Sequence, residues 1–291
     1  MGDYINHHYI PKFLLKKWEG GRDEKLSQMR WIRGRICEKR FKAKSVAYRE
    51  HLYSMDRLAA QPNVDIEPKF MSRHIDDPAA LVHESIIKND FNEMSDKLRA
   101  TWVLFLVSLI YRGPEAVELV RERGIDALSS QFEVNGEMSE PLKKLLELYL
   151  SRHPSLLDFG VYALPVLIQD SSYNKIIYDC PWYLHVLRCE DKLLIGDRPL
   201  VFIKGRKNGG IFYLPLAPNL AFFASTSSVV WKDFILNRSD QNLVRILNRE
   251  MVEQASIYVW GSDFDHQKLL NQRLLPTRAG LALGIGKRSA V

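Results

Sequence analysis

The hydrophobic period changes twice along the chain, and this change limits the fold more than any other feature of the sequence. Between residues 79 and 152, apolar residues recur at helical spacing, and the segments end at turn residues. Before and after this block, short apolar runs have the length and alternation of strands. We therefore predict a central helical block between two strand-rich regions.

The strongest helix signal is the run from Trp102 to Tyr111, inside a predicted helix over 97–112. Apolar residues cover nearly all faces of this helix, so we expect it to be buried in the core. The run is about half as long as a membrane-spanning helix must be, so we expect no membrane association. A second clear helix is predicted over 239–255, with Ser239 as its N-cap.

Strands are predicted on both sides of the helical block. Residues 28–36 alternate apolar with basic side chains, which suits one strand with a solvated, positive face. After the block, strands are predicted over 161–168, 175–179, 182–189, 192–195, 199–204, 211–214, 220–224 and 256–260. The sequence therefore predicts an α+β protein. A single mixed sheet is built from N- and C-terminal strands, and the central helical block packs beside it.

The length and composition favour one structural domain. A chain of 291 residues allows one large domain or two closely packed ones, and 46% hydrophobic residues exclude disorder as the main state. We divide the chain into a basic N-terminal strand region over 1–55, the helical block over 79–152, and a strand-rich region over 161–279. The last region contains the helix 239–255.

The positive charge of the chain is concentrated near its N-terminus. The formal net charge is +6, and the first 51 residues contain 13 Lys and Arg against 6 Asp and Glu. Such asymmetry favours phosphate-rich partners, although solvated surfaces can carry it without a ligand. The cysteines Cys37, Cys180 and Cys189 lie far apart, with no zinc-ligand spacing, and no apolar leader opens the chain. We therefore expect a cytoplasmic protein without disulfides or structural zinc.

Basic and aromatic residues are interleaved in the N-terminal strand region. Aromatic rings stack on bases, and Lys and Arg contact phosphates, in proteins that bind single strands. We predict RNA or single-stranded DNA as the partner, contacted by Arg30, Trp31, Arg33, Arg35, Arg40 and Lys42. The alternative is a solvated sheet face without a ligand.

The adjacent histidines His7 and His8 are the first catalytic candidates. Imidazole serves in acid–base chemistry near neutral pH or as a metal ligand. Neighbours on a strand point to opposite faces, so only one of the two can serve a given pocket. The alternative is a structural histidine bonded to a backbone carbonyl. An HNH-type metal site also begins with paired histidines, but residues 19–50 contain no Asn and no His, which excludes it.

Asp197 is the third catalytic candidate. It follows the predicted strand 192–195 and stands two residues before Pro199, an arrangement that can aim a carboxylate into a cleft. We predict that it orients His7 or His8, as carboxylates do in catalytic dyads. The alternative is a turn held by a capping hydrogen bond.

The sequence lacks the motifs of several other kinds of catalytic and cofactor-binding site. His83, Glu84 and Asp90 lie on a predicted helix without sharing one face, so we predict no metal site. The chain lacks the nucleophile elbow, the P-loop and the dinucleotide-binding glycine motif. The sequence therefore names no cofactor.

Several short motifs follow one another between residues 6 and 260. They are His7-His8-Tyr9-Ile10-Pro11 with Phe13, Leu14 and Trp18, Arg112-Gly113-Pro114, Gly196-Asp197-Arg198-Pro199, Pro215-Leu216-Ala217-Pro218, Asn248, and Ile257-Tyr258-Val259. In this set and order the chain resembles a mostly bacterial family described as domain of unknown function 4238. Residues 28–55 depart from it, because they lack the aromatic-Asp-Lys strand of many members. The resemblance implies a continuous fold and carries no activity with it.

These observations predict a nucleic-acid-interacting protein, with a small nuclease-like effector as its catalytic form. The basic N-terminal strands would hold the backbone of the nucleic acid, His7 or His8 would be the acid–base group, and Asp197 would orient it. The alternative is a non-catalytic interaction or regulatory module. A hydrolase of small molecules finds no nucleophile to support it. The sequence leaves open the substrate, the oligomeric state and whether the chain is an enzyme.

Overall fold

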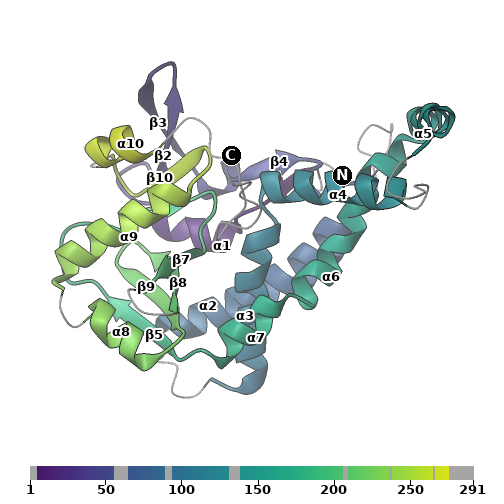
Figure 1. Ribbon diagram of the computed structural model, residues 1–291. Helices are drawn as coiled ribbons and strands as arrows, with labels where there is room; N and C mark the ends of the chain where they lie inside the picture. The colour runs from purple at the N-terminus through teal and green to yellow at the C-terminus, as the bar shows by residue number, and fades with distance from the viewer. Residues whose placement is uncertain are drawn as a thin grey trace.

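The computed structural model describes residues 5–55, 65–88, 94–130, 138–205, 209–235, 238–264 and 266–274 (Figure 1). The strands are β1 (Asn6–His8), β2 (Leu26–Ile32), β3 (Arg35–Phe41), β4 (Tyr48–Glu50), β5 (Trp182–Val186), β6 (Ile195–Gly196), β7 (Val201–Lys204), β8 (Gly210–Ala217), β9 (Leu220–Ser225) and β10 (Tyr258–Gly261). The α-helices are α1 (Lys12–Leu15), α2 (Asp77–Lys88), α3 (Asp96–Tyr111), α4 (Pro114–Ser130), α5 (Glu140–Arg152), α6 (Leu164–Gln169), α7 (Ser172–Asp179), α8 (Ser228–Ile235), α9 (Asp240–Gln254) and α10 (Gln267–Arg273). A π-helix covers Ile66–Asp76, and a 3-10 helix covers Pro154–Ala163.

The predicted α+β class is confirmed, but the prediction of one mixed sheet is wrong. The strands form three sheets, with the orders β1-β4, β3-β2-β10-β6 and β5-β9-β8-β7. Every pair of neighbouring strands is antiparallel. The N-terminal strand β1 pairs with the nearby β4, so it does not join the sheet that contains β6. Pairing of β1 within the N-terminal region closes a shorter loop than pairing with a strand near residue 195 would.

The sheet β5-β9-β8-β7 lies between two layers of helices (Figure 1). Nearly every residue of β8 and β9 is buried. Strands covered on both faces need consecutive apolar residues, and these two strands have such runs in place of an apolar–polar alternation. On one face, Phe222 lies 6.0 Å from the ring of Trp102 in α3. On the other face, Phe223 lies 4.9 Å from the ring of Trp231 in α8. Each face of this sheet therefore belongs to a hydrophobic core.

The two strongest helix predictions are confirmed. The helix α3 covers Asp96–Tyr111, and the side chains of Trp102 and Phe105 are fully buried. The helix α9 begins after Ser239, whose Oγ accepts a hydrogen bond from the amide of Asn242 at 3.4 Å. In the part of the chain that the structure describes, no helix is long and apolar enough to cross a membrane.

The sheet β3-β2-β10-β6 joins the N-terminal strands to strands from the last third of the chain. The hairpin β2–β3 stands away from the body at the top of Figure 1. Its two-residue turn is Arg33-Gly34, with φ of +47° and +83°, and such left-handed turns match the twist of paired strands. This turn divides the predicted strand 28–36 into two, so the prediction of a single strand there is wrong.

Two predicted strands are helical. Residues 161–168 fall in the 3-10 helix and in α6, and residues 175–179 fall in α7. Ser171 caps α7 by accepting a hydrogen bond from the amide of Tyr173 at 3.3 Å, and Ile177 is fully buried. Apolar runs of five to eight residues fit either a strand or a buried helix, and here the cap favours the helix.

Candidate functional site

His7 is a buried residue of β1 that faces the segment after β4. Its Nδ1 accepts a hydrogen bond from the backbone amide of Tyr53 at 2.9 Å. Its ring also stacks on the ring of Tyr53, with centroids 5.4 Å apart and planes 16° apart. The lone pair of Nδ1 is therefore engaged by the backbone, in a contact that fixes the chain after β4.

His8 points to the opposite side of β1, as strand geometry requires. Its Nε2 lies 3.4 Å from the carbonyl oxygen of Lys44. Burial, together with the positive charge of Lys12, lowers the pKa of His8 to about 4, so the imidazole is neutral at pH 7. The two histidines thus contact different segments, His7 the segment after β4 and His8 the segment between β3 and β4.

A fully buried arginine, Arg112, is hydrogen-bonded both to His8 and to Tyr53, the partner of His7. Its guanidinium donates to both carboxylate oxygens of Asp76, at 2.6 and 2.9 Å, and to the carbonyl of His8 at 2.8 Å. The carbonyl of Arg112 accepts from the hydroxyl of Tyr53 at 2.8 Å. A buried, bidentate arginine of this kind fixes register between elements.

Beside Arg112 lies Glu67, near the start of the π-helix. Glu67 is 9% exposed, and burial raises its pKa to about 7 although Arg112 opposes this shift. Among the described residues, neither Oε2 of Glu67 nor Nε of Arg112 has a hydrogen-bond partner. A π-helix is rare and often occurs at functional sites. A carboxyl group that titrates near neutral pH is thus placed next to the N-terminal motif.

Asp197 is bound to the backbone at the start of β10. Its carboxylate accepts hydrogen bonds from the amides of Ser256, Ile257 and Tyr258, at 2.7, 2.7 and 2.9 Å. Burial raises the pKa of Asp197 to about 6, and the three amides act in the opposite direction. No histidine donates a hydrogen bond to this carboxylate within the described ranges. The predicted dyad therefore has no direct contact, and Asp197 holds β10 against β6.

The N-terminal motif does approach Asp197, but through Tyr9. Burial and the carboxylates of Asp197 and Glu115 raise the pKa of Tyr9 well above its usual value. Glu115 also accepts a hydrogen bond from the hydroxyl of Ser256 and lies 3.8 Å from the guanidinium of Arg198. The motif predictions did not include Tyr9 as a site residue. Its spacing of two from His7 was the available signal, because residues two positions apart in an extended chain point to the same side, and Tyr9 directly follows β1.

The same end of β10 borders a basic surface on the neighbouring hairpin β2–β3, which we call the open face. Arg30 pairs across β2–β10 with Tyr258, and its guanidinium carbon lies 5.7 Å from the ring centroid of Tyr258. Its Nη1 donates to the hydroxyl of Tyr258 at 3.2 Å. Arg35 and Lys39 share this face, because each lies two positions from Cys37, the residue of β3 that pairs with Arg30. Both side chains are exposed, and no carboxylate pairs with either in the described chain.

Two predicted nucleic-acid-binding residues lie off the open face. Trp31 points to the other side of the sheet, where it packs with the apolar cluster that contains Ile36 and Leu270 of α10. Arg33 occupies the exposed turn at the tip of the hairpin. The structure thus groups Arg30 with Arg35 and Lys39 and separates these from Trp31.

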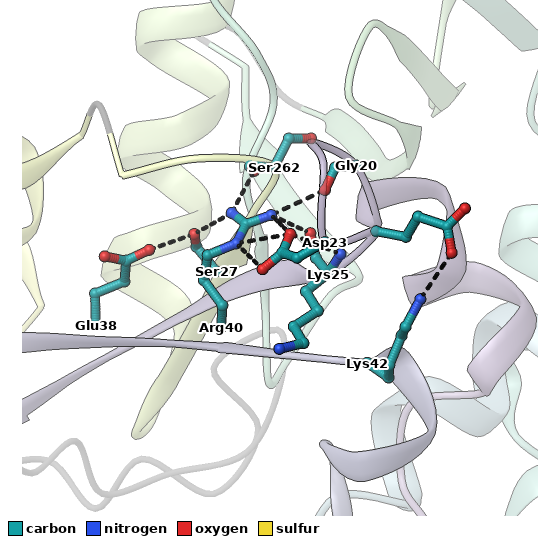
Figure 2. Close-up of polar contacts among 9 residues, drawn as sticks. Gly20, Asp23, Lys25, Ser27, Glu38, Arg40, Lys42 and Ser262 are labelled. Atoms are coloured by element: carbon teal, nitrogen blue, oxygen red, sulfur yellow. Dashed lines mark hydrogen bonds and ion pairs between the residues drawn. The ribbon is translucent and has the colours of Figure 1, made fainter.

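Arg40 and Lys42 have protein partners at the base of the hairpin (Figure 2). The guanidinium of Arg40 is paired with Asp23 at 2.8 Å. It also donates to the carbonyls of Gly20, Lys25 and Ser262 and to the hydroxyl of Ser27. Lys42 pairs with Glu24 at 3.1 Å. These contacts tie the hairpin to its surroundings and engage the donors of Arg40 that a phosphate would need.

Two further observations concern metals and relatives. In the described part of the chain, no group of three or more His, Cys, Asp or Glu residues is placed to hold a metal ion. The model of the family described as "Protein of unknown function (DUF4238)" matches residues 6–265, and the chain belongs to this family. The resemblance inferred from the short motifs is therefore confirmed. No curated protein and no solved structure matches the chain.

Proposed function

We propose that the protein binds single-stranded RNA or DNA on the open face of the sheet β3-β2-β10-β6. The observation that supports this is the position of Arg30, Arg35 and Lys39 on one exposed face, beside the ring of Tyr258. Cations at this spacing contact successive phosphates, and an accessible face of a half-buried aromatic ring such as that of Tyr258 can stack on a base. A strand of nucleic acid lying across β10 would run toward the buried cluster of Tyr9 and Asp197.

Binding to a fluorescein-labelled oligouridylate or oligothymidylate, measured by fluorescence anisotropy, tests this proposal. Three phosphate contacts predict that affinity falls about 20-fold between about 50 and about 200 mM salt. The double reversal Arg30→Glu with Arg35→Glu should abolish binding at the lower salt. The matched control is Lys232→Glu with Arg245→Glu, which changes the net charge equally on exposed positions of α8 and α9. Absence of micromolar binding, or equal loss in both double variants, rejects the proposal.

A nuclease-like activity is a separate proposal, with His7 or His8 as the acid–base group and Asp197 as the orienting carboxylate. It is supported by the approach of the N-terminal motif to Asp197 through Tyr9. Cleavage of the labelled oligonucleotides, lost in His8→Gln with an unchanged thermal midpoint, would support it. Binding without cleavage in the presence of Mg²⁺, Mn²⁺ or Zn²⁺ would reject it and leave a binding protein.

The second candidate function is a non-catalytic interaction module. The helix α5 has no buried residue, and Leu145, Leu148 and Tyr149 are 60%, 48% and 53% exposed. Apolar surface of this kind is found where proteins meet partners. Analytical ultracentrifugation of the parent and of Leu145→Glu with Leu148→Glu tests whether copies of the chain associate there.

We also propose that the protein is cytoplasmic. Cys37, Cys180 and Cys189 are free thiols, as a reducing compartment would keep them. Fractionation of cells that express a tagged chain tests this location, and recovery outside the cytoplasm would reject it.

A further inference from the structure

A cavity of about 480 Å³ lies between α8 and α9, beside the ends of β7 and β8. The helices α8 and α9 form the layer that covers one face of the sheet β5-β9-β8-β7 (Figure 1). Its volume lies within the range of small-molecule sites, about 300–1,000 Å³. The cavity is distant in sequence from the open face and is composed of other elements.

The cavity exists because the two helices are anchored differently. The helix α9 buries Leu243, Leu247 and Met251 against the sheet. The helix α8 has no buried residue and is held by aromatic contacts, in which Trp231 stacks on Tyr183 at 4.3 Å with planes 9° apart. The helices therefore leave an open wedge above the edge strand β7.

The walls of the wedge are apolar. Ile203 and Ile211 form the side contributed by the strands, and Val230, Phe234 and Ile246 form the sides contributed by the helices. Ile211 is 1% exposed, and Val230 and Phe234 pack against the same hydrophobic core. A ligand with an apolar body would extend this core into the cavity.

Charged groups surround the mouth, and their balance is positive. Arg249 and Glu250 neutralise one another in an ion pair of 2.8 Å. The guanidinium of Arg238 lies over the ring of Phe234, 5.0 Å from its centroid, and donates to the backbone carbonyl of Asp233. In the described chain, Arg238 forms no ion pair with a carboxylate.

Lys204, at the end of β7, is exposed and forms no ion pair within the described residues. Among the described residues that line the mouth, two cations, Lys204 and Arg238, are therefore opposed by one carboxylate without an ion pair, that of Asp233.

We propose that this cavity binds a small anionic amphiphile, with an apolar chain in the wedge and a carboxylate or similar anionic group at Lys204 and Arg238. The ammonium of Lys204 and the guanidinium of Arg238 supply charge-assisted hydrogen bonds to the head group. The apolar chain displaces water from Ile203, Phe234 and Ile246. This inference is independent of nucleic-acid binding on the open face.

Three probes with the same alkyl chain test it: octanoate, octanol and octylammonium, each below its micellar concentration. Isothermal titration calorimetry should show saturable binding of octanoate, weaker binding of octanol and none of octylammonium. Lys204→Gln should lower the affinity for octanoate about tenfold and leave that for octanol unchanged. Lys232→Gln, an exposed lysine of α8 that does not line the cavity, is the control and should change neither.

A variant that fills the cavity separates this site from adsorption elsewhere. Ile246→Trp should abolish binding of both octanoate and octanol. Val229→Trp, at a lining position that is 70% exposed, repeats the test without altering a packed side chain. Binding of octanoate that survives both tryptophans overturns the site. Equal binding of octanoate and octylammonium overturns the anionic class, and absence of any octanoate binding overturns the proposal as a whole.

Discussion

The two four-stranded sheets of this protein differ in what covers them. The sheet β5-β9-β8-β7 has helices on both faces, and nearly every residue of β8 and β9 is buried. The sheet β3-β2-β10-β6 has α10 against one face of its hairpin, and its other face carries exposed arginines near the tip. A sheet covered twice requires consecutive apolar residues, whereas the outer part of a hairpin that is covered on one face keeps alternation and can present charge. The first sheet is therefore a structural centre, and the second has the surface on which a ligand can bind.

A second difference lies within the hairpin itself. At its base, Arg40 is surrounded by Asp23 and by the three carbonyl groups of Gly20, Lys25 and Ser262 (Figure 2). Toward its tip, Arg30 contacts the ring and hydroxyl of Tyr258 and has no carboxylate partner among the described residues, and Arg35 is exposed. Residues of one chemical type thus hold the hairpin at one end and are available to a ligand at the other.

The largest expected effect tests the sheet that is covered twice. Phe105→Ala removes a fully buried ring from α3, beneath Trp102, and should lower the free energy of unfolding by about 3–5 kcal/mol. Urea unfolding followed by circular dichroism measures this change. Leu98→Ala, at a position of α3 that is 36% exposed, is the control and should cost much less. An unchanged midpoint for Phe105→Ala would place α3 outside the core.

The next effect concerns the junction of the sheet β3-β2-β10-β6. Asp197→Ala leaves three backbone amides of residues 256–258 without their acceptor and should cost about 2–4 kcal/mol. The same unfolding measurement applies, and Asp197→Asn should recover part of the loss by retaining one acceptor oxygen. A stable Asp197→Ala that has lost a nuclease activity would instead favour the orienting role.

The two ends of the hairpin should respond differently to the same substitution. Arg40→Ala removes hydrogen bonds to three carbonyls and should destabilise the protein by about 1–2 kcal/mol. Arg35→Ala should change stability by less than about 0.5 kcal/mol and should weaken binding of the labelled oligonucleotide. Similar stability losses in the two variants would remove the distinction between base and tip.

The last prediction is a dependence of stability on pH at Glu67. Its folded pKa of about 7 lies above the usual value of 4.5, so the folded state binds the proton more tightly. The contribution of this group to stability is present below about pH 4.5 and is lost as pH rises through about 7. The groups that face it are Arg112, Asp76, Lys12 and the backbone of His8.

Glu67→Gln removes this titration. Relative to the parent, the variant should gain about 2–3 kcal/mol in free energy of unfolding between pH 5 and pH 8, measured with urea. The comparison isolates Glu67, because His8 and His83 titrate in both proteins. A difference between parent and variant that does not change with pH would show that Glu67 is ionised throughout this range.

The patterns with the most local information were predicted correctly. The buried helix α3 and the capped helix α9 follow from apolar spacing and from one N-cap residue, and both are found. The strands predicted over 161–168 and 175–179 are helical, because runs of that length fit either structure and the caps decide between them. The sequence pattern did not indicate the turn Arg33-Gly34, because apolar and basic residues alternate on both sides of it, in both strands of the hairpin.

The candidate site was less accessible to sequence reasoning. The motifs singled out His7, His8 and Asp197, and all three side chains are buried in the structure. Their partners are backbone groups of Tyr53, Lys44 and residues 256–258, which no motif could name. Backbone partners depend on how segments far apart in the chain are brought together, and this is not encoded at the position of the side chain.

The sequence by itself determined the order of helical and strand-rich regions and the basic character of the N-terminal strands. Both properties depend on residues within a few positions of one another, through periodicity, capping and composition. Only the tertiary structure decided which cations are available. Arg40 is held by a carbonyl 222 positions away, at Ser262, whereas Arg35 meets no carboxylate in the described chain. A charge is left for a ligand where folding brings no partner to it, and the distance between such partners along the chain is too long for a local pattern to record.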